Sequence, residues 1–354
     1  MLNKKCLVSY GEIDEVGAAL QLLMQAPPEV DDADANEIAK VHYGVLTQAK
    51  TLTGERDKNF LLSLGTEKWV LKAINQHEQP SETDLQIQVL KHLAQKQCAV
   101  QTPKAIQTLD GEDVLAYGKH QMRAYTFLEG TPVNQVSMTY PLQHSFGQTT
   151  AQLLKALQDF DHPVLSRVIL WDVMCLGHLE NWAQEVMGKA ALDQFILRFF
   201  AYFNDNVLPK LQQLPKKAIH GDLSQSNLVV DVDNQQRISG VLDFGDMVKA
   251  PRVVELGIAA SYALGTNLDV MQSFEHIVAG FETESALEAL EKEVLMDVIV
   301  ARLVQRIVIT TWRAQRFPDN AAYILRGTAH AQAVLQALLA NEAVHARYVF
   351  ESES

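Results

Sequence analysis

Two apolar runs on either side of a polar turn, centred near residue 235, constrain the fold of this chain more than any other feature. Residues 228–232 and 238–242 are rich in β-forming side chains, and residues 233–236 between them are typical of a turn, so the pattern predicts a β-hairpin. An antiparallel hairpin with this centre brings Asn227 and Asp243 side by side at its open end. An amide oxygen and a carboxylate held together favour Mg²⁺ bound along with nucleotide phosphates.

Asp222 lies five residues before Asn227, on the loop that enters the hairpin. A carboxylate at that place can orient an attacking hydroxyl group and accept its proton. His220, Asp222, Asn227 and the D-F-G triplet at residues 243–245 also follow the order of the catalytic segments of protein kinases, with Gly221 in place of the usual arginine. The alternative is two unrelated acidic loops beside an ordinary hairpin, and it requires both spacings to arise by chance.

The chain changes character at a connector that contains a glycine and a proline, residues 128–132. Before it, the pattern predicts a helix over 33–41, strands over 49–53, 59–64, 68–74, 105–108 and 122–127, and a helix over 82–95. After it, helices are predicted over 141–160, 180–208 and 285–316. This pattern predicts an α+β fold with two lobes, and the kinase-like order of the catalytic segment makes a two-lobed protein-kinase-like fold the expected one. Residues 1–129 would form a small antiparallel β lobe that binds nucleotide, with a preceding helical segment. Residues 130–354 would form a larger, mostly helical lobe with the catalytic loop and the substrate site.

The composition argues against several classes of protein. The formal net charge of −13 disfavours a nucleic-acid binder and a negatively charged membrane surface as partner. The sequence has no apolar run of about 18 residues and so predicts no membrane span. Cys6, Cys98 and Cys175 form neither a CxxC pair nor a zinc spacing, and isolated thiols of this kind indicate a reducing compartment. We expect a cytoplasmic protein.

The segment HGDLSQSNLVV, followed by ISGVLDFGDM, resembles the aminoglycoside phosphotransferase and choline kinase superfamily, which shares the protein-kinase fold. His-Gly-Asp in place of His-Arg-Asp is characteristic of that group. Within it, the wording is similar to the hydroxylysine kinase group and its bacterial relatives, and similarity at 41–46, 84–86, 128–133 and 170–173 extends the match over roughly residues 40–265. The resemblance implies a kinase that uses ATP or GTP with Mg²⁺ and phosphorylates a hydroxyl group of a small molecule.

The resemblance also implies a role for each matching residue. Asp222 would be the catalytic base, Asn227 and Asp243 would bind Mg²⁺, and His220 would brace the catalytic loop. Lys72, in the predicted strand 68–74, would contact the α- and β-phosphates. An ordinary solvent-facing strand lysine is the alternative for Lys72.

Further positions complete the expected nucleotide site. Kinases pair the phosphate-binding lysine with a glutamate of the following helix. Here the inward position falls on Gln86, whose amide oxygen can accept a hydrogen bond from an ammonium group. The turn over 53–59 has only Gly54 where protein kinases have three glycines, and its backbone N–H groups are expected near the phosphates. The backbone at Tyr125 and Phe127 would hold the edge of an adenine or guanine base.

Acidic side chains near the transfer site favour a cationic acceptor. They are Asp222, Asp243 and Asp246, of which Asp246 would line the substrate entrance, and we expect a small hydroxylated amino acid or amine of the 5-hydroxylysine type. A carboxylate on such a substrate would need a cation. Arg252 is the first candidate, ahead of Lys249, because its planar fork suits a carboxylate. Aminoglycoside-, choline- or homoserine-type acceptors are the alternatives.

Two other classes of function are disfavoured by the same segment. A kinase acting on protein is disfavoured by Gly221, and a nucleotide-binding module without catalysis is disfavoured because Asp222, Asn227 and Asp243 are all present. Glu255 is expected either to anchor the catalytic loop or to lie on a helix surface. As partner we expect a small-molecule hydroxyl substrate, with no nucleic acid and no membrane, and a homodimer is one candidate assembly.

Overall fold

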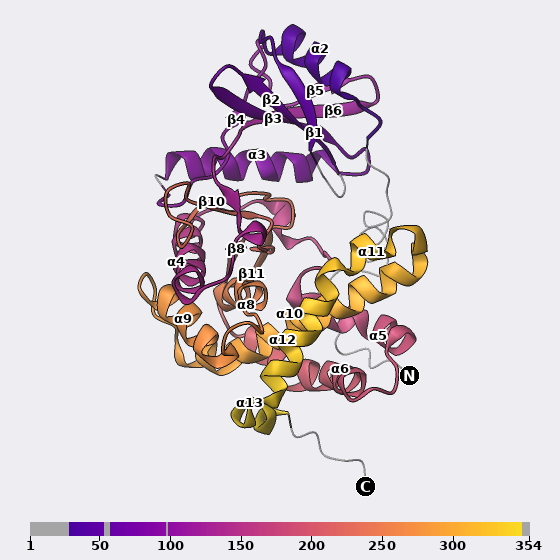
Figure 1. Ribbon diagram of the computed structural model, residues 1–354, viewed down its shortest axis with the longest axis vertical. Coiled ribbons are helices and arrows are strands. Elements are labelled where there is room, and N and C mark those ends of the chain that lie inside the picture. The colour runs from indigo at the N-terminus through magenta and orange to yellow at the C-terminus, as the bar shows by residue number, and fades with distance from the viewer. Residues whose placement is uncertain (1–27, 53–56, 97, 349–354) are drawn as a thin grey trace.

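The computed structural model describes residues 28–52, 57–96 and 98–348 of the chain. Its first part is an antiparallel sheet with a helix on each face (Figure 1). The elements follow in the order α2 (Asp32–His42), β1 (Gln48–Leu52), β2 (Lys58–Leu64), β3 (Glu67–Ile74), α3 (Pro80–Gln95), β4 (Ala105–Ile106), β5 (Leu115–Tyr117) and β6 (His120–Thr126). The strands are arranged β1-β2-β3-β6-β4, with β5 paired to β6.

The two faces of this sheet have different partners because side chains alternate along each strand. Leu71 of β3 and Ala124 of β6 pack with Ile38 of α2 in a buried apolar cluster. Lys72 lies opposite Arg123 of β6, and both therefore belong to the other face, the one covered by α3 (Figure 1). The sheet thus directs Lys72 toward the inside of the molecule.

A short connector joins the sheet to the rest of the chain and passes close to the catalytic hairpin. Gly130 has a φ of +144°, and a Cβ at this position would lie 2.5 Å from the carbonyl oxygen of Val230. Only glycine tolerates both the dihedral angle and the close approach. β7 (Thr131–Pro132) then pairs with β9 (Leu228–Val230), and β9 pairs with β10 (Ile238–Val241). The hairpin is thereby attached to the connector.

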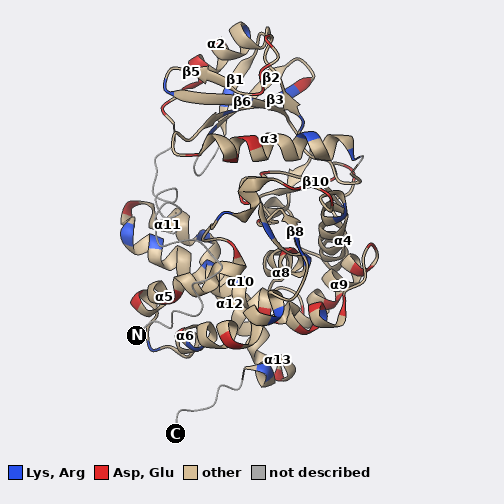
Figure 2. Ribbon diagram, turned by 180° about the vertical axis from the view of Figure 1, so that it is seen from behind, with Lys and Arg blue, Asp and Glu red and all other residues tan. Residues whose placement is uncertain are grey.

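The second part is mostly helical and contains the main hydrophobic core. Its helices are α4 (Tyr140–Ala156), α5 (Glu180–Val186), α6 (Ala191–Tyr202), α7 (Leu208–Leu211), α8 (Arg252–Ala263), α9 (Val270–Glu282), α10 (Ala289–Arg316), α11 (Ala321–Ile324), α12 (Thr328–Ala340) and α13 (Glu342–Arg347). Short 3-10 helices lie at Val133–Gln135, Pro163–Ser166, Val173–Leu179, Pro318–Asn320 and Leu325–Gly327. Residues 294–309 of α10 are all buried, so this helix runs through the core. Figure 2 shows acidic and basic residues interspersed over the elements of both parts.

The arrangement expected from the sequence, an antiparallel β part followed by a mostly helical part, is confirmed. The boundary at 129/130 stays a prediction. The helix expected over 180–208 is wrong as one unit, because the chain leaves α5 in an extended conformation at Met187, turns through a bend at residues 189–190, and continues as α6, a π-helical turn at Phe203–Val207, and α7. Asp193 in the first turn of α6 accepts the Gly188 amide at 3.0 Å and fixes this turn.

The hairpin differs from the expected one by one residue. Next to the turn, Val230 lies opposite Ile238, and not opposite Gly240 as a centre at residue 235 requires. A β-bulge between Ile238 and Gly240 then recovers one residue of this difference, so that the amide of Leu242, not that of Asp243, donates to the carbonyl oxygen of Asn227 at 2.8 Å. Asp243 follows directly after this pair. Within the described residues, no helix combines the length and the apolar character needed to cross a bilayer.

Candidate active site

The catalytic loop and the D-F-G loop start from one small sheet. β8 (Lys216–Ile219) leads into His220, and β11 (Val248–Pro251), its antiparallel partner, follows the D-F-G loop, with Val248 opposite Ile219. The buried His220 ring joins the two loops, because its Nε2 donates to the carbonyl oxygen of Leu242 at 2.9 Å and its Nδ1 accepts from the Asp222 amide at 3.3 Å. These partners assign the ring hydrogen to Nε2.

The D-F-G loop explains sterically why the middle residue of His-Gly-Asp is a glycine. Gly221 has a φ of +82°, and a Cβ there would lie 2.3 Å from the carbonyl oxygen of Asp246. Any larger residue would push the two loops apart. The Gly221 amide donates to Oε2 of the fully buried Glu255 at 3.0 Å. Glu255 was expected either to anchor the catalytic loop or to lie on a helix surface, and the structure supports the anchor.

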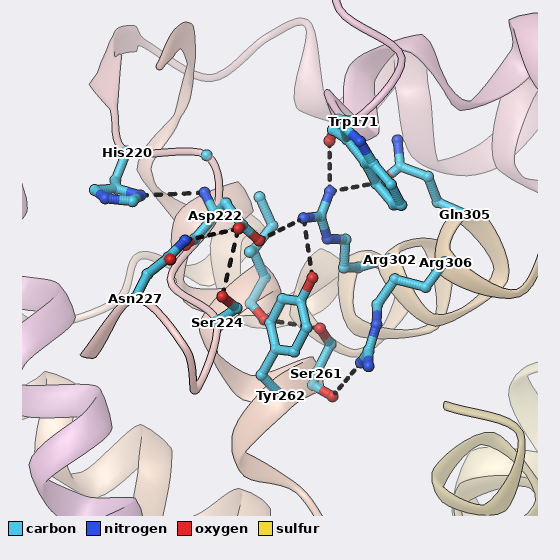
Figure 3. Close-up of polar contacts among 12 residues, drawn as sticks. Trp171, His220, Asp222, Ser224, Asn227, Ser261, Tyr262, Arg302, Gln305 and Arg306 are labelled. Atoms are coloured by element: carbon cyan, nitrogen blue, oxygen red, sulfur yellow. Dashed lines mark hydrogen bonds and ion pairs between the residues drawn. The ribbon is translucent and has the colours of Figure 1, made fainter. Parts of the chain in front are cut away.

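Asp222 has protein partners on both of its carboxylate oxygens (Figure 3). Oδ2 accepts from the side-chain amide of Asn227 at 2.8 Å and from the hydroxyl of Ser224 at 3.4 Å. Oδ1 accepts from Nη2 of Arg302 at 3.0 Å. Burial raises the pKa of Asp222 above its ordinary value, and the charge of Asp246 acts in the same direction while Arg302 opposes both. The carboxylate is thus held in one orientation at the centre of the site.

The two residues expected to bind the metal lie at the open end of the hairpin. The amide nitrogen of Asn227 donates to Asp222, which leaves the amide oxygen of Asn227 as the group for a cation. Asp243 has a φ of +59°, a left-handed conformation uncommon for this residue, and its Oδ1 accepts from the Gly245 amide at 3.2 Å. One amide oxygen and one carboxylate fit Mg²⁺, which takes few protein ligands when nucleotide phosphates supply others.

Lys72 pairs with Asp57 and not with Gln86, which corrects the expectation from the sequence. Its Nζ lies 2.8 Å from Oδ2 of Asp57, at the start of β2. Burial alone would lower the pKa of Lys72, but the carboxylates of Asp57 and Asp243 outweigh it, so the pKa lies above its ordinary value. Lys72 and Asp243 thus interact electrostatically, although they belong to different parts of the molecule.

Gln86 occupies the inward position of α3 but has a different partner. Its Oε1 accepts from Nη2 of Arg123 at 2.6 Å, and its Nε2 donates to Glu78 at 3.2 Å. Arg123 is 1% exposed and lies next to Lys72 across the strands, so it reaches Gln86 first. A neutral amide is sufficient at this place because carboxylates already balance both cations: Glu78 lies 3.7 Å from Nη1 of Arg123, and Asp57 pairs with Lys72.

Arg167 connects α3 to the D-F-G loop. Its Nη1 lies 2.5 Å from Oε1 of Glu82 in the first turn of α3, and its Nη2 donates to the carbonyl oxygens of Gly245 and Met247. Both side chains of this ion pair are largely buried. The loop that follows Asp243 is therefore held against the helix that carries Gln86.

The remaining nucleotide positions are partly defined. Gly54 lies outside the described residues. The side chain of Tyr125 stacks near the Arg123 guanidinium, at 5.5 Å from ring centroid to Cζ. The Phe127 amide donates to the carbonyl oxygen of Lys68 at 3.0 Å within the sheet. The edge of an adenine or guanine base could therefore not bind the Phe127 amide. It would have to bind carbonyl groups of residues 125–127 or the amide of Leu128.

The candidate cations for a substrate carboxylate are engaged elsewhere, and the expectation for Arg252 is wrong. Arg252 forms a two-point ion pair with Glu291, at 2.7 Å and 2.6 Å, and its Nη1 donates to Ser285 at 2.5 Å. Lys249 pairs with Asp161 at 3.2 Å. Arg252 thus fastens the start of α8 to the start of α10 and to the segment before it.

Sequence reasoning missed Asp57, Arg123, Arg167 and Arg302. Arg302 had a signal in the sequence, because Arg302, Gln305 and Arg306 interrupt the otherwise apolar stretch 298–309 at spacings that share one face. The other three had no local signal, since their partners come from distant segments.

The comparisons with known proteins agree with this geometry. A family profile described as "Phosphotransferase enzyme family" matches residues 49–290. Hydroxylysine kinase of Mus musculus is 25% identical over 336 residues, which cover 87% of this chain and 89% of that protein. A microcompartment-associated aminopropanol kinase superposes with a TM-score of 0.68 at 22% identity, over 87% of this chain and 98% of its own. Amicoumacin kinase with AMP-PNP and Ca²⁺ superposes with a TM-score of 0.63 at 15% identity, over 91% and 96%. The protein-kinase-like fold is confirmed.

Proposed function

The chain belongs to the phosphotransferase enzyme family and is a small-molecule kinase, and we propose that it transfers the γ-phosphoryl group of ATP or GTP, with Mg²⁺, to a hydroxyl of a small amine-bearing acceptor of the 5-hydroxylysine type. The observation that carries this proposal is the hydrogen-bonded His220, which sets the loop of Asp222 against the loop of Asp243. A base and a metal ligand on adjoining loops are the arrangement that phosphoryl transfer needs.

Each residue of the site has a separate task in this reaction. Lys72 would contact the α- and β-phosphates, and Asn227 and Asp243 would hold Mg²⁺. The metal ion, when bound, neutralises charge on the transferred phosphoryl group. Asp222 would orient the acceptor hydroxyl and accept its proton as the oxygen attacks. The fixed direction of the Asp222 carboxylate supports this task, because transfer depends mainly on positioning.

The acceptor class follows from the charges of the site and from the relatives. The charge of Asp246 helps to raise the pKa of Asp222, and two neighbouring carboxylates favour an acceptor with a cationic amine. Similar proteins are named hydroxylysine kinase, in mouse and in Danio rerio, and one similar structure is an aminopropanol kinase. Since Arg252 and Lys249 hold protein carboxylates, we place recognition on the amine of the acceptor and not on its carboxylate.

A panel of acceptors tests the proposal. Release of nucleoside diphosphate would be measured with 5-hydroxylysine, 1-amino-2-propanol, homoserine, choline and an aminoglycoside, each with ATP and with GTP. We expect the highest kcat/KM with 5-hydroxylysine or the amino alcohol. Turnover on choline or the aminoglycoside alone would overturn the acceptor class and leave the kinase assignment in place. No diphosphate release with any hydroxylated amine would contradict the amine-bearing acceptor altogether.

A further inference from the structure

The core helix α10 carries a polar group directly to the catalytic base, and it does so from outside the residues that the family profile matches, 49–290. Arg302 lies in the buried stretch of this helix and is 1% exposed. Its partner Asp222 is 80 residues away in the sequence. A buried charge in an apolar helix is costly unless it is paired and hydrogen-bonded, so the position of Arg302 needs an explanation.

The guanidinium group of Arg302 is fixed by partners from four segments of the chain (Figure 3). Nη1 donates to the carbonyl oxygen of Trp171 at 2.6 Å and to Oε1 of Gln305 at 2.9 Å. Nη2 donates to Oδ1 of Asp222 at 3.0 Å and to the hydroxyl of Tyr262 at 3.3 Å. The rings of Trp171 and Tyr262 lie 5.1 Å and 5.7 Å from its Cζ. These contacts leave the guanidinium little freedom to rotate.

Gln305 helps to hold the Arg302 guanidinium and is itself held by the segment 170–172. Its Nε2 donates to the carbonyl oxygens of Leu170 and Asp172, both at 2.9 Å, and this sets which end of its amide faces Arg302. The amide oxygen of Gln305 is therefore aimed at the guanidinium. The segment 170–172, α8 and α10 thus converge on one group that is bonded to Asp222.

We propose that Arg302 is the positioning residue of the catalytic base: it holds Oδ1 of Asp222, while Asn227 holds Oδ2, so that the plane of the carboxylate is fixed for the acceptor hydroxyl. This inference rests on the proposed function, in which Asp222 is the base. A carboxylate bonded through one oxygen only can turn about its Cβ–Cγ bond, and two bonded oxygens prevent this. Because its side chain is buried, Arg302 acts through Asp222 and has no contact of its own with the acceptor.

The chain offers a matched control in Arg306, one turn further along α10. Arg306 is also buried, and it lies 4.1 Å from the ring centroid of Tyr262. It donates to the carbonyl oxygens of Ser261 at 3.2 Å and Gly327 at 3.4 Å, and within the described part of the chain it forms no ion pair with a carboxylate. Arg306→Ala therefore removes a buried guanidinium from the same helix without releasing Asp222.

The experiment compares kcat and KM of Arg302→Ala, Arg302→Lys and Arg306→Ala with the wild type. We expect Arg302→Ala to lower kcat by about 10²-fold, since a small misplacement of a reacting group has an effect of that size, with KM for the nucleotide within about twofold. The kcat of Arg302→Lys should lie between that of Arg302→Ala and that of the wild type. Arg306→Ala should keep kcat within about threefold of the wild type. Added guanidinium, far below denaturing concentrations, should restore part of the activity of Arg302→Ala, and urea, a neutral molecule of the same shape, should not.

A double variant tests whether Arg302 acts through Asp222. In the Asp222→Asn background, Arg302→Ala should change kcat by no more than about threefold, because the group that it positions is already disabled. Independent, multiplicative effects would overturn the proposal. So would equal losses in Arg302→Ala and Arg306→Ala without rescue by guanidinium, which indicate packing alone. If Arg302→Ala does not fold, Arg302→Lys decides, and wild-type kcat in that variant refutes a role for the planar fork.

The acceptor panel on the wild-type enzyme separates this proposal from the proposed function. The role of Arg302 is tested only by the ratio of the variant kcat to the wild-type kcat, measured with an acceptor that the wild type phosphorylates. Where the wild type uses none of the panel, the same ratio is measured for nucleotide hydrolysis, with water as the acceptor at Asp222. Equal rates in Arg302→Ala and the wild type would then overturn the role of Arg302, whatever the acceptor is.

Discussion

Asp57→Asn removes the negative charge that faces Lys72 and keeps the shape of the side chain. The two charged atoms lie 2.8 Å apart, and the side chains of Lys72 and Asp57 are only 15% and 10% exposed, so water screens this pair little. Oδ1 of Asp57 also accepts a hydrogen bond from the backbone amide of Asn75 at 2.8 Å. The side-chain oxygen of an asparagine at position 57 can keep this hydrogen bond. The substitution therefore isolates the effect of the charge.

The expected loss of stability is about 3 kcal/mol, the lower end of the range for removing one partner of a buried ion pair. The lower end applies because Asp243 also stabilises the charged form of Lys72. Burial raises the pKa of Asp57, but Lys72 outweighs it, so the pKa lies below its ordinary value. A depressed carboxyl pKa contributes stability that is present above the unfolded-state pKa of about 4 and is lost as the pH falls through the folded-state pKa. The raised pKa of Lys72 keeps that group charged up to about pH 10, so the difference between the two proteins should be constant from about pH 5 to 9.

Urea unfolding of wild type and Asp57→Asn at several pH values measures this difference directly. We expect it to shrink when Mg²⁺ and nucleotide are added, because the phosphates supply Lys72 with a new negative partner and bound ligand stabilises the folded state. Asp57→Ala, which also removes the hydrogen bond from Asn75, should be less stable than Asp57→Asn. A difference below about 1 kcal/mol at pH 7 would place the pair among the weak, solvent-screened ion pairs and refute the reasoning. A difference that grows with nucleotide would show that Asp57 itself supports nucleotide binding.

Three further substitutions test the rest of the site. Asp222→Asn should lower kcat by about 10²–10⁴-fold and leave nucleotide affinity, measured by calorimetry, nearly unchanged; near-normal turnover would remove it as the base. Asp243→Asn should raise the Mg²⁺ concentration needed for half-maximal rate and also lower the maximal rate, and an unchanged Mg²⁺ titration would contradict its role. Gly221→Ala should destabilise the protein by about 2 kcal/mol or more, because its Cβ would meet the Asp246 carbonyl in a left-handed conformation; a wild-type unfolding midpoint would show that the loops can separate freely.

The fold and the centre of the site could be predicted from the sequence because their signals are local. The hairpin, the helix α3 and the order of His220, Asp222 and Asn227 all depend on patterns within a few tens of residues. Even the one-residue error in the hairpin had a local cause, because the strands pair around a turn centred closer to the first strand than the sequence pattern indicated, and a β-bulge corrects only part of the difference. Gln86 was also placed correctly on the inward face of α3, since it is 6% exposed.

The partners of these residues could not be predicted, because they are set by strand register and helix packing. Asp57 meets Lys72 only because β2 and β3 pair with Asn59 opposite Lys72. Arg252 illustrates the same limit. Its planar fork does bind a carboxylate at two points, as its chemistry suggested, but the carboxylate is that of Glu291 in the same protein. Residue type predicted the interaction, and only the fold could supply the partner.

Three arginines from outside the catalytic motif, two of them buried and one half-buried, explain how the motif is held in place. Arg123 of the sheet binds Gln86 of α3, Arg167 binds Glu82 of α3 together with the D-F-G loop, and Arg302 of α10 binds the base. Each of these contacts joins elements that are distant in the sequence, so each forms only when both elements have packed. In a chain with a net charge of −13, acidic groups gathered at one site would repel each other unless cations were placed among them. Arginine suits this task because its fork can bond two elements at once while its charge stays fixed. The geometry of the base and of the metal-binding loop therefore depends on the packing of both parts of the molecule, and not on the motif alone.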